Sequence, residues 1–561
     1  MARFNVSGLL VLFVALVLPS GALALWPIPR NLTTGTSALK LDTNFTISVN
    51  VSDSPSDLVD AVNQTKQYLE NDRLGRLVVG RGANDTAALS GAKTISGLTL
   101  SLEENTTVNS IAYEARLKLE DRVEGYRLTI PNDGSDATLV ANTTLGLYRG
   151  LTTFSQIWYW YGGETYTLEA PFEIADLPAY PYRGLGLDTS RHYFPVDSIL
   201  RTLDAMSWVK INTFHWHVTD SQSWPLYVVE YPDLAQYGAY SAQQVYSEQD
   251  IQNILSYAGA HGIDVLLEID TPGHSGSIGS AYPDYIACMY ETPWSSYAGE
   301  PPAGQLRMTV PEVVNFTTSL LSSVAKTMPS SYFSTGGDEI NSACYLDDPI
   351  TSTYLNTTNT TLNGVLDTFT NSTHSALVGL GKTPVVWEEM VLEWNLTSLS
   401  NETIVMTWIS SQDAAAIADK GFRIVQAPSN YFYLDEGQGS WVGGDPFGGS
   451  GTFITWQYAY TYDPLANLTE SQQALVLGGQ QILWAEQSAA QNLEPTVWPR
   501  AAASAEIFWS ATQPGGIPLN GTEALPRLQD LRYRMVQRGL NAIPLQPEWC
   551  SLRPHACDQY S

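Results

Sequence analysis

The chain has 561 residues, of which 44% are apolar and 15% are charged, so it contains ample material for a buried core and does not resemble a disordered protein. Its formal net charge of -29 argues against nucleic acid and anionic membranes as partners and favours a neutral or cationic substrate. Solubility is the simplest explanation of that charge, and charge alone assigns no function.

Residues 1–24 are predicted to be a secretory signal peptide. Arg3 precedes an apolar run from Leu9 to Leu18, and Ala22 and Ala24 form a small-residue cleavage site. The apolar run is shorter than the about 20 residues that span a bilayer, so we expect a secreted, extracellular protein without a membrane anchor. Roughly fifteen Asn-x-Ser/Thr sequons agree with passage through the secretory pathway as a glycoprotein.

The four cysteines predict two disulfide bonds in an oxidising compartment, although three connectivities are possible. Cys550 and Cys557 are close in sequence and are expected to pair, which leaves Cys288 with Cys344. The alternative is a metal site or a catalytic thiol, but no CxxC pair or Cys-His spacing supports it. We therefore expect no metal and no cofactor.

Residues 25–176 are predicted to form a small α+β domain. Strand-like runs and helical stretches alternate in this part of the chain. The expected strands are Phe45–Val51, Leu77–Val79, Ala115–Leu119 and Tyr126–Ile130, and the expected helices lie near Asp57–Glu70 and Thr144–Tyr161. The Pro-rich stretch 176–181 then breaks the pattern and marks a linker.

Residues 177–561 are predicted to form a TIM barrel, because short apolar strands here alternate with longer helical segments. One helix has a capping box at Ser247 and Asp250, with Gly262 past its end, and another covers Ser198–Lys210. Eight strands close a (β/α)8 barrel. The expected strands are Arg183–Asp188, Ile211–His217, Ile263–Ile269, Tyr332–Gly337, Thr383–Trp387, Thr403–Trp408, Phe422–Gln426 and Gln481–Trp484. The fold class is therefore α/β, a TIM barrel preceded by a smaller α+β domain.

Polar and aromatic side chains gather at the carboxyl ends of the eight predicted strands, where the active sites of this fold are built. Aromatic faces stack on sugars, while carboxylates and Arg bind hydroxyl groups, so the pattern favours a carbohydrate ligand. In strand order the residues are Asp188 and Arg191, His217 and Asp220, Asp270 and His274, Asp338 and Glu339, Trp387, Trp408, Tyr433 and Asp435, and Trp484 and Glu486.

Several local motifs at these strand ends resemble those of one known family. They are Arg183-Gly184 with Asp188-Thr-Ser-Arg-His-Tyr193, Phe214-His-Trp-His217 with Asp220, Asp270-Thr-Pro-Gly-His274, Gly336-Gly-Asp-Glu339, and Trp484 with Glu486. In combination, over about 25–557, they resemble the β-N-acetylhexosaminidases of glycoside hydrolase family 20, in particular the secreted filamentous-fungal type. Any one of the motifs alone would be weak.

This resemblance implies an exo-acting enzyme that removes terminal N-acetylglucosamine or N-acetylgalactosamine by substrate-assisted, retaining catalysis. The substrate's own acetamido oxygen would attack the anomeric carbon. Glu339 would protonate the leaving oxygen and later activate water, while Asp338 would orient the acetamido N-H and stabilise positive charge. Tyr433 would bind the acetamido oxygen, and the methyl group would be enclosed by Trp387, Trp408 and Trp484.

The resemblance also implies roles for the remaining polar residues. Arg191 and Glu486 would bind the hydroxyls at C3 and C4 of the terminal sugar, with Asp435 as a further contact. His274 and Asp270 would form a dyad close to Glu339. The alternatives are an ion pair for Arg191 and a buried core histidine for His274. For His217 and Asp220, substrate contact and a scaffold role are left open.

One requirement follows from backbone geometry. Successive residues of a strand point to opposite faces, so Asp338 and Glu339 can share a pocket only where regular strand geometry ends. Gly336 and Gly337 give the backbone that latitude. The alternative is that the acidic pair is merely a solvated strand end.

Two rival functions are considered. A conventional retaining glycosidase would use Glu486 as nucleophile opposite Glu339, and a lectin-like, inactive barrel would bind glycans without cleaving them.

The natural substrate, chitin fragments or glycoprotein glycans, is left open, and a homodimer is expected from the family. Fungal members can lose a propeptide after the signal, which residues 25–176 would include, but the chain has no dibasic processing site. The family's frequent third disulfide is missing, so packing is expected to hold the loop 445–456 near the subsite entrance.

Overall fold

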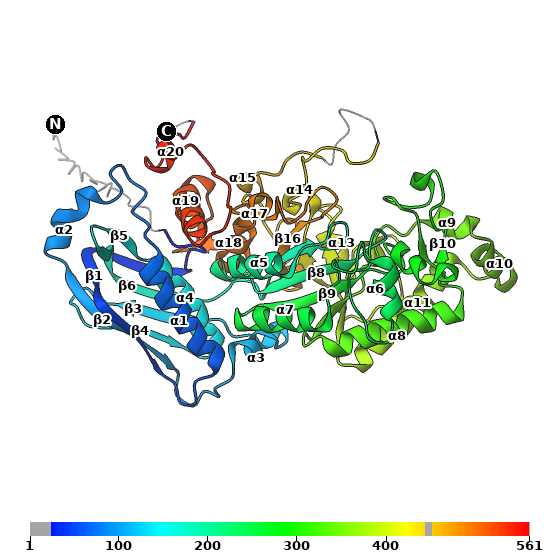
Figure 1. The fold of residues 1–561 in the computed structure, drawn as a ribbon, viewed down its shortest axis with the longest axis horizontal. Helices are drawn as coiled ribbons and strands as arrows, with labels where there is room; N and C mark the ends of the chain where they lie inside the picture. The colour runs from blue at the N-terminus through cyan, green and yellow to red at the C-terminus, as the bar shows by residue number, and fades with distance from the viewer. Residues whose placement is uncertain (1–23, 444–450, 560–561) are drawn as a thin grey trace, which may run out of the picture.

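A computed structural model describes residues 24–443 and 451–559 (Figure 1). Residues 1–23 of the predicted signal peptide lie outside the described residues. Among the helices of the described ranges, none is long and apolar enough to cross a membrane. Figure 1 shows a β-sheet at one end of the molecule and a barrel beside it, with α1 and α4 between them.

The N-terminal part is a six-stranded sheet in the order β1-β2-β4-β3-β6-β5, with an additional pairing between β1 and β6. Leucines of the sheet and of the two main helices form one apolar core beneath it. The elements are β1 (Asn31–Asn50), α1 (Ser56–Asn71), α2 (Thr86–Ser90), β2 (Lys93–Leu102), α3 (Ile111–Ala115), β3 (Tyr126–Ile130), β4 (Ala137–Ala141), α4 (Thr144–Gln156), β5 (Tyr159–Tyr161) and β6 (Glu164–Asp176).

The structure corrects three elements expected in this part. Residues 77–79 form turns, and 115–119 contain the end of α3 and a turn, so neither segment is a strand. Leu77, Ala115 and Leu119 are buried all the same, whereas Val79 is exposed, and runs this short do not separate a strand from a turn. The helix expected over 144–161 ends at Gln156, and its last residues form β5.

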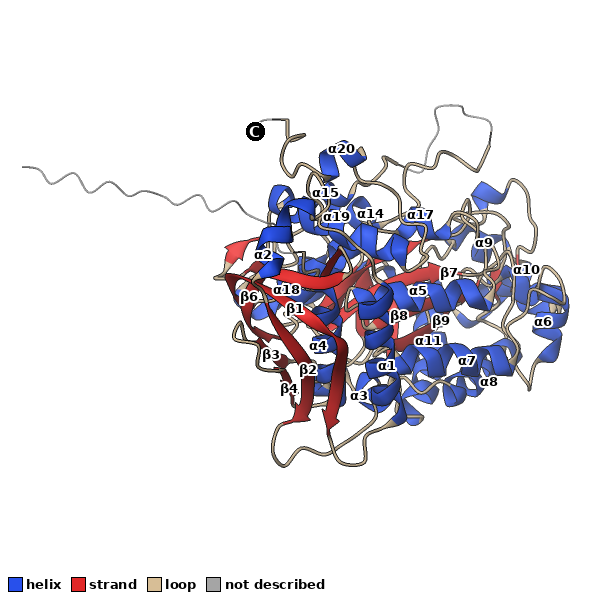
Figure 2. Ribbon diagram, turned by 60° about the vertical axis from the view of Figure 1, so that its left-hand side comes forward, coloured by secondary structure: helices blue, strands red, loops and turns tan. Residues whose placement is uncertain are grey.

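Eight parallel strands close the predicted barrel, each overlapping its expected range. Most of their side chains are buried, as expected when helices cover the outside (Figure 2). The strands are β7 (Tyr182–Asp188), β8 (Thr213–Thr219), β9 (Asp264–Ile269), β12 (Tyr332–Ser334), β13 (Thr383–Trp387), β14 (Ile404–Thr407), β15 (Arg423–Gln426) and β16 (Val476–Leu483). The predicted fold class is confirmed.

The helices of the barrel follow the predicted punctuation where it was strong. The capping box of α7 is present, because the Ser247 hydroxyl accepts from Asp250 N and Asp250 Oδ2 accepts from Ser247 N. The helices are α5 (Val196–Trp208), α6 (Pro232–Gly238), α7 (Glu248–Ala260), α8 (Pro311–Thr327), α9 (Ser342–Asp347), α10 (Pro349–Thr358), α11 (Leu362–Gly379), α12 (Glu389–Leu392), α13 (Ala414–Asp419), α14 (Ser429–Phe432), α15 (Trp456–Ala459), α16 (Glu470–Gln473), α17 (Leu493–Val497), α18 (Ala502–Ser510), α19 (Gly521–Gln537) and α20 (Glu548–Ser551). Two further two-stranded sheets are too short to build a layer: β10 (Ile286–Ala287) with β11 (Gln305–Leu306), and β17 (Thr512–Gln513) with β18 (Ile517–Pro518). An isolated bridge joins Tyr433 to Ile482.

Buried ion pairs and disulfides join the parts of the fold. Glu124 of the N-terminal part accepts from Arg149 and from Arg183 at the start of the barrel, and all three side chains are at most 1% exposed. The predicted disulfides Cys288–Cys344 and Cys550–Cys557 are both present. The first ties the segment after β9 to α9, so it stiffens loops on the side of the barrel that carries the candidate site.

Candidate active site

A cavity of about 190 Å³ lies at the carboxyl end of the barrel. It contains most of the residues that the strand ends predict, gathered from seven of the eight strands and their loops. The lining residues are Arg191, His217, His274, Glu300, Asp338, Glu339, Trp408, Tyr433, Asp435, Glu436, Trp441, Trp484, Glu486 and Gln487.

The backbone leaves strand geometry just before the acidic pair. Strand β12 ends at Ser334, and positive φ angles follow at Gly336 (63°), Gly337 (100°) and Glu339 (50°). A side chain at Gly336 would collide with the Asp270 carboxyl group, so glycine is required there for space as well as for φ. The irregular turn lets Asp338 and Glu339 line the same cavity, as the sequence predicted.

The two carboxyl groups differ in exposure. The Asp338 side chain is 11% exposed and the Glu339 side chain 33%. Gly299 lies directly against the Glu339 carboxyl group, where a Cβ atom would clash with it. Asp338 therefore lies deep in the cavity. Glu339 lies nearer to solvent, and the backbone at Gly299 packs against one side of its carboxyl group.

The environment also separates the pKa values of the pair. Burial, followed by the nearby Asp270 carboxyl group, raises the pKa of Asp338 well above its usual range. Burial also raises the pKa of Glu339, but the hydrogen bond and charge of His274 outweigh burial and hold this pKa below its usual value. Asp270, Asp338 and Glu339 form a cluster of carboxyl groups. The cluster keeps a proton to higher pH than an isolated carboxyl group does, and that proton is shared by the cluster and not assigned to one residue.

His274 links Glu339 to a buried aspartate. Its Nδ1 lies 3.1 Å from Asp220 Oδ1, and its Nε2 lies 3.4 Å from Glu339 Oε2 and 3.8 Å from Asp338 Oδ2. Burial lowers the pKa of His274, but the Asp220 and Asp338 charges outweigh it and raise the pKa well above the usual value. His274 therefore keeps its second proton to higher pH than an ordinary histidine does.

The predicted Asp270–His274 dyad is wrong in its pairing. The hydrogen-bond partner of His274 is Asp220, and Asp270 Oδ1 instead accepts from Gly337 N at 2.7 Å. Asp270 and Asp338 lie close enough to share a proton, and burial raises the pKa of Asp270 to about 7. The turn at 336–337 explains this pairing, because it places the Gly337 N-H and the Asp338 carboxyl group against Asp270.

Asp270→Asn is expected to move the acidic limb of the kcat/KM profile to lower pH, because the role predicted for Asp338 needs its carboxylate form. The variant removes a negative neighbour that raises the pKa of Asp338, and an amide can donate to the Asp338 carboxylate, so the cluster should lose its proton earlier. The measurement is kcat/KM from about pH 3 to 9. Asp530→Asn in α19 is the control, because Asp530 is also buried with a raised pKa but pairs with Arg534 away from the cavity. An unmoved or upward-shifted limb in Asp270→Asn would contradict this electrostatic account.

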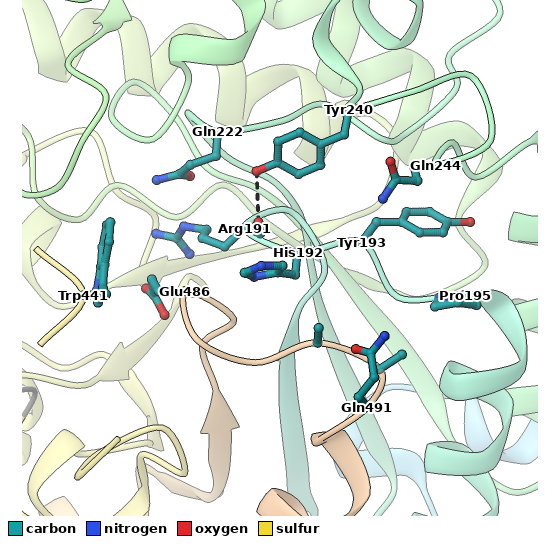
Figure 3. A pocket seen from close by; sticks show the side chains of 12 residues that line it. Arg191, His192, Tyr193, Pro195, Gln222, Tyr240, Gln244, Trp441, Glu486 and Gln491 are labelled. Atoms are coloured by element: carbon teal, nitrogen blue, oxygen red, sulfur yellow. Dashed lines mark hydrogen bonds between the residues drawn. The ribbon is translucent and has the colours of Figure 1, made fainter. Parts of the chain in front are cut away.

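Arg191 is both ion-paired and exposed to the cavity. Its guanidinium contacts Asp188 Oδ2 at 3.1 Å, Asp220 Oδ2 at 3.0 Å and Glu300 Oε1, and its carbonyl accepts from the Tyr240 hydroxyl at 2.9 Å. Figure 3 shows the side chain between Gln222 and Glu486. Arg191 therefore forms the ion pairs that the alternative expected, and it also lines the cavity.

A second, larger groove of about 970 Å³ shares Arg191, Trp441 and Glu486 with the cavity. These three residues form the boundary between the two spaces (Figure 3). Burial raises the pKa of Glu486 to about 8 despite Arg191, and raises that of Asp435 to about 7, so both can donate as well as accept hydrogen bonds at mildly acidic pH.

Aromatic rings form one side of the cavity. Trp408 and Tyr433 stack with centroids 6.4 Å apart, and Trp484 lies 6.2 Å from Tyr433 and from Trp387. Among the described residues, Trp387 is buried behind this lining instead of facing the cavity. Tyr433 lies in the segment that follows β15. A β-bridge joins it to Ile482 of β16, so the Tyr433 ring lies beside Trp484.

Three contributors were missed by the sequence analysis. Glu300 accepts from Arg191 and Gln222, and Gly299 makes room for Glu339. Glu389 Oε2 accepts from the Trp408 indole at 2.8 Å and so fixes the orientation of that ring. Glu389 follows the strand end at Trp387 and could have been found by the strand-end argument, whereas Glu300 lies in a long loop that gives no such signal.

His217 and Asp220 belong to the scaffold more than to the cavity surface. His217 bonds Glu268 on one side and Asp220 on the other, and Asp220 is fully buried. Residues 444–450 of the loop expected near the entrance lie outside the described residues. Its described end is packed, because Ile454 and Trp456 are buried in the barrel core.

Some carboxylate and imidazole atoms come within 4.8 Å of one another in groups of three. The groups are His217 with Glu268 and Asp270, Asp220 with His274 and Glu300, and Asp270 with His274 and Asp338. Arg191 and the imidazoles already supply positive charge to these carboxylates, and we assign no ion to them.

A barrel whose cavity joins an acidic pair to an aromatic wall and an ion-paired arginine has the features of a carbohydrate-active enzyme. Residues 180–512 match the catalytic domain of glycosyl hydrolase family 20, and residues 25–157 match the beta-acetyl hexosaminidase like family. The chain belongs to glycoside hydrolase family 20.

Relatives and solved structures agree with this assignment. A beta-hexosaminidase of Arthroderma benhamiae is 34% identical over 78% of this chain and 74% of its own length. A chitooligosaccharidolytic beta-N-acetylglucosaminidase of Ostrinia furnacalis is 34% identical over 76% of this chain and 74% of its own. A Flavobacterium johnsoniae chitobiase structure has a TM-score of 0.74 at 25% identity and covers 94% of this chain and 74% of its own.

Proposed function

We propose that this protein is an exo-acting β-N-acetylhexosaminidase that removes terminal N-acetylglucosamine or N-acetylgalactosamine from the non-reducing ends of oligosaccharides. The observation that carries the proposal is the joint placement of Asp338, Glu339 and an aromatic wall in one cavity of about 190 Å³. A cavity of this size suits one terminal sugar and does not resemble an open cleft for an internal segment. The names of the relatives support the same activity.

The proposed reaction is substrate-assisted hydrolysis with retention. The acetamido oxygen attacks the anomeric carbon while the bond to the leaving oxygen breaks and Glu339 supplies its proton. Asp338 accepts a hydrogen bond from the acetamido N-H and stabilises the positive charge of the cyclic oxazolinium ion. Glu339, now a carboxylate, takes a proton from water as the water opens that ring. Holding the acetamido group in place makes the first step intramolecular.

The remaining residues have binding roles in this proposal. Tyr433 donates to the acetamido oxygen, and Trp408 and Trp484 enclose the methyl group, with Trp387 supporting them from behind. Arg191, Glu486 and Asp435 bind sugar hydroxyls. The pKa of Glu486 near 8 makes it a poor nucleophile at acidic pH, which disfavours the conventional two-carboxylate alternative.

The setting of the enzyme is also a proposal. The signal-like segment 1–24, the sequons and the two disulfides support secretion as a glycoprotein. Hydrolysis of chitin fragments is supported by the chitooligosaccharide-degrading relative and leaves glycoprotein glycans as the other candidate substrate. A homodimer and domain limits at 25–176 and 177–561 complete the proposal.

The function is tested by the products of chitotetraose digestion. The expected result is stepwise release of N-acetylglucosamine from the non-reducing end, with chitotriose and chitobiose as intermediates. Reducing-end labelling separates this order from random cleavage. Binding of chitotetraose without release of any product would identify the lectin-like alternative instead.

A further inference from the structure

A continuous row of polar side chains connects Glu339 to the interior of the barrel. Beginning at the barrel axis, Glu268 Oε1 lies 2.5 Å from His217 Nδ1, and His217 Nε2 lies 2.8 Å from Asp220 Oδ2. Asp220 Oδ1 then lies 3.1 Å from His274 Nδ1, and His274 Nε2 lies 3.4 Å from Glu339 Oε2. Glu268 is fully buried in β9, outside the residues that line the cavity.

We propose that Glu268 is a positioning residue for the catalytic acid, and that it acts on Glu339 through His217, Asp220 and His274. We call these four residues the relay. Glu268 itself makes no contact with the sugar. The inference rests on the proposed hydrolase function and adds a residue to its machinery that neither the sequence motifs nor the cavity indicate.

The hydrogen bonds of the relay fix where each proton lies. His217 is buried between two carboxylates, whose hydrogen bonds outweigh the effect of burial and raise its pKa to about 10. As an imidazolium it donates from both ring nitrogens, to Glu268 and to Asp220. Asp220 Oδ2 also contacts Arg191, and its Oδ1 faces His274, so Asp220 can only accept. His274 must then carry a proton on Nδ1, which leaves Nε2 aimed at Glu339.

This order of protons suits an acid that must give its proton away. As Glu339 protonates the leaving oxygen, it becomes a carboxylate 3.4 Å from the His274 Nε2. A protonated His274 donates to that carboxylate and lowers the barrier to proton transfer. The relay keeps the ring in the orientation and protonation state that this donation requires.

Glu268 is itself held from several elements. His215 Nε2 of β8 lies 3.0 Å from Glu268 Oε2, Gln480 of β16 contacts His215, and the Ser334 hydroxyl of β12 donates to the same oxygen. The other titratable groups that act on it or that it acts on are Asp270, directly after β9, and Tyr182 of β7. Four strands therefore fix the position of a carboxylate that the reaction itself does not touch.

Replacing this carboxylate by an amide tests the relay with little change in size. In Glu268→Gln, His217 loses one of the two carboxylates that raise its pKa and keeps the other, Asp220. A neutral amide holds the imidazolium less tightly than a carboxylate does. The His217 ring is then held less firmly against Asp220, and the anchor of His274 is weakened.

The expected result is a fall in kcat of about tenfold for chitobiose, less than the 10²- to 10⁴-fold contribution of a general acid itself. The fall should be much smaller for an N-acetylglucosaminide with a dinitrophenyl leaving group, which needs no protonation, and KM should stay within about threefold. Glu506→Gln is the matched control, since Glu506 is an equally buried glutamate that pairs with Arg527 far from the cavity. It should change thermal stability without any dependence on the leaving group.

Two further outcomes decide the proposal. His217→Gln should show the same leaving-group dependence, and adding Glu268→Gln to it should cost little more, because both changes break one path. Additive losses, or equal losses for both leaving groups, would show a purely structural role and overturn the inference. If Glu268→Gln does not fold, His217→Gln alone carries the leaving-group test. A wild-type protein inactive on both substrates would instead reject the proposed function.

Discussion

Glu339→Gln is expected to lower kcat for substrates with poor leaving groups by about 10²- to 10⁴-fold. The glutamine keeps the size of the side chain beside Gly299, so the fold and the cavity should be preserved. For a dinitrophenyl leaving group the first step needs no acid, and activity there should be limited only by the lost activation of water. The measurement is kcat for chitobiose and for the aryl substrate, with circular dichroism to verify the fold.

The partly exposed position of Glu339 supports this expectation. With 33% of its side chain exposed, it can reach both the leaving oxygen and incoming water, whereas Asp338 at 11% cannot. Near-normal turnover of chitobiose by Glu339→Gln would assign the acid to another residue. Glu389 would then be the first candidate, because burial raises its pKa to about 8 and it lies near Asp338.

Asp338→Asn is expected to lower kcat by about 10²- to 10³-fold, the usual effect of removing one preorganised group that stabilises charge in the transition state. An amide oxygen can still accept from the acetamido N-H, but it carries no charge to stabilise the oxazolinium ion. KM should change far less than kcat, because the charge develops only in the transition state. Steady-state kinetics on an aryl N-acetylglucosaminide measures both values, and an effect confined to KM would contradict the role.

The same substitution should leave stability unharmed near neutral pH. Burial raises the pKa of Asp338, so the folded protein binds a proton that the unfolded chain releases, and stability falls as pH rises from the unfolded to the folded pKa. Asparagine removes this cost. The Tm of Asp338→Asn should therefore equal or exceed that of the wild type at pH 7, with a smaller difference at pH 4. A lower Tm at pH 7 would show that the carboxylate contributes to folding.

The barrel could be predicted from the sequence because its strands are buried on both faces. A segment such as Ile263–Ile269 is a short apolar run bounded by a helix stop and a polar strand end, and both signals are local. In the N-terminal sheet, strands β2 and β6 mix polar and apolar residues on a half-exposed surface. The run 77–79 is too short to show a period, and 115–119 alternates apolar and polar residues as a half-buried strand would, so the local pattern misassigned both.

Within the site, the strand ends predicted which residues come together but not how they pair. The family resemblance implied a dyad of Asp270 and His274, whereas the turn at Gly336 and Gly337 brings Asp338 and the Gly337 N-H onto Asp270, and the partner of His274 is Asp220. Glu300 contacts Arg191 across more than one hundred residues of sequence, a tertiary contact that no local pattern encodes. Trp387 is buried behind Trp484, and this tertiary contact is likewise not encoded by a local pattern.

The most direct measurement of the central claim compares an aryl N-acetylglucosaminide with the corresponding aryl glucoside and adds a thiazoline mimic of the cyclic intermediate. The acetamido group is the nucleophile in our account, so only the first substrate should be hydrolysed, and the thiazoline should inhibit strongly in the wild type and weakly in Asp338→Asn. Hydrolysis of both aryl glycosides at similar rates, without inhibition by the thiazoline, would contradict it.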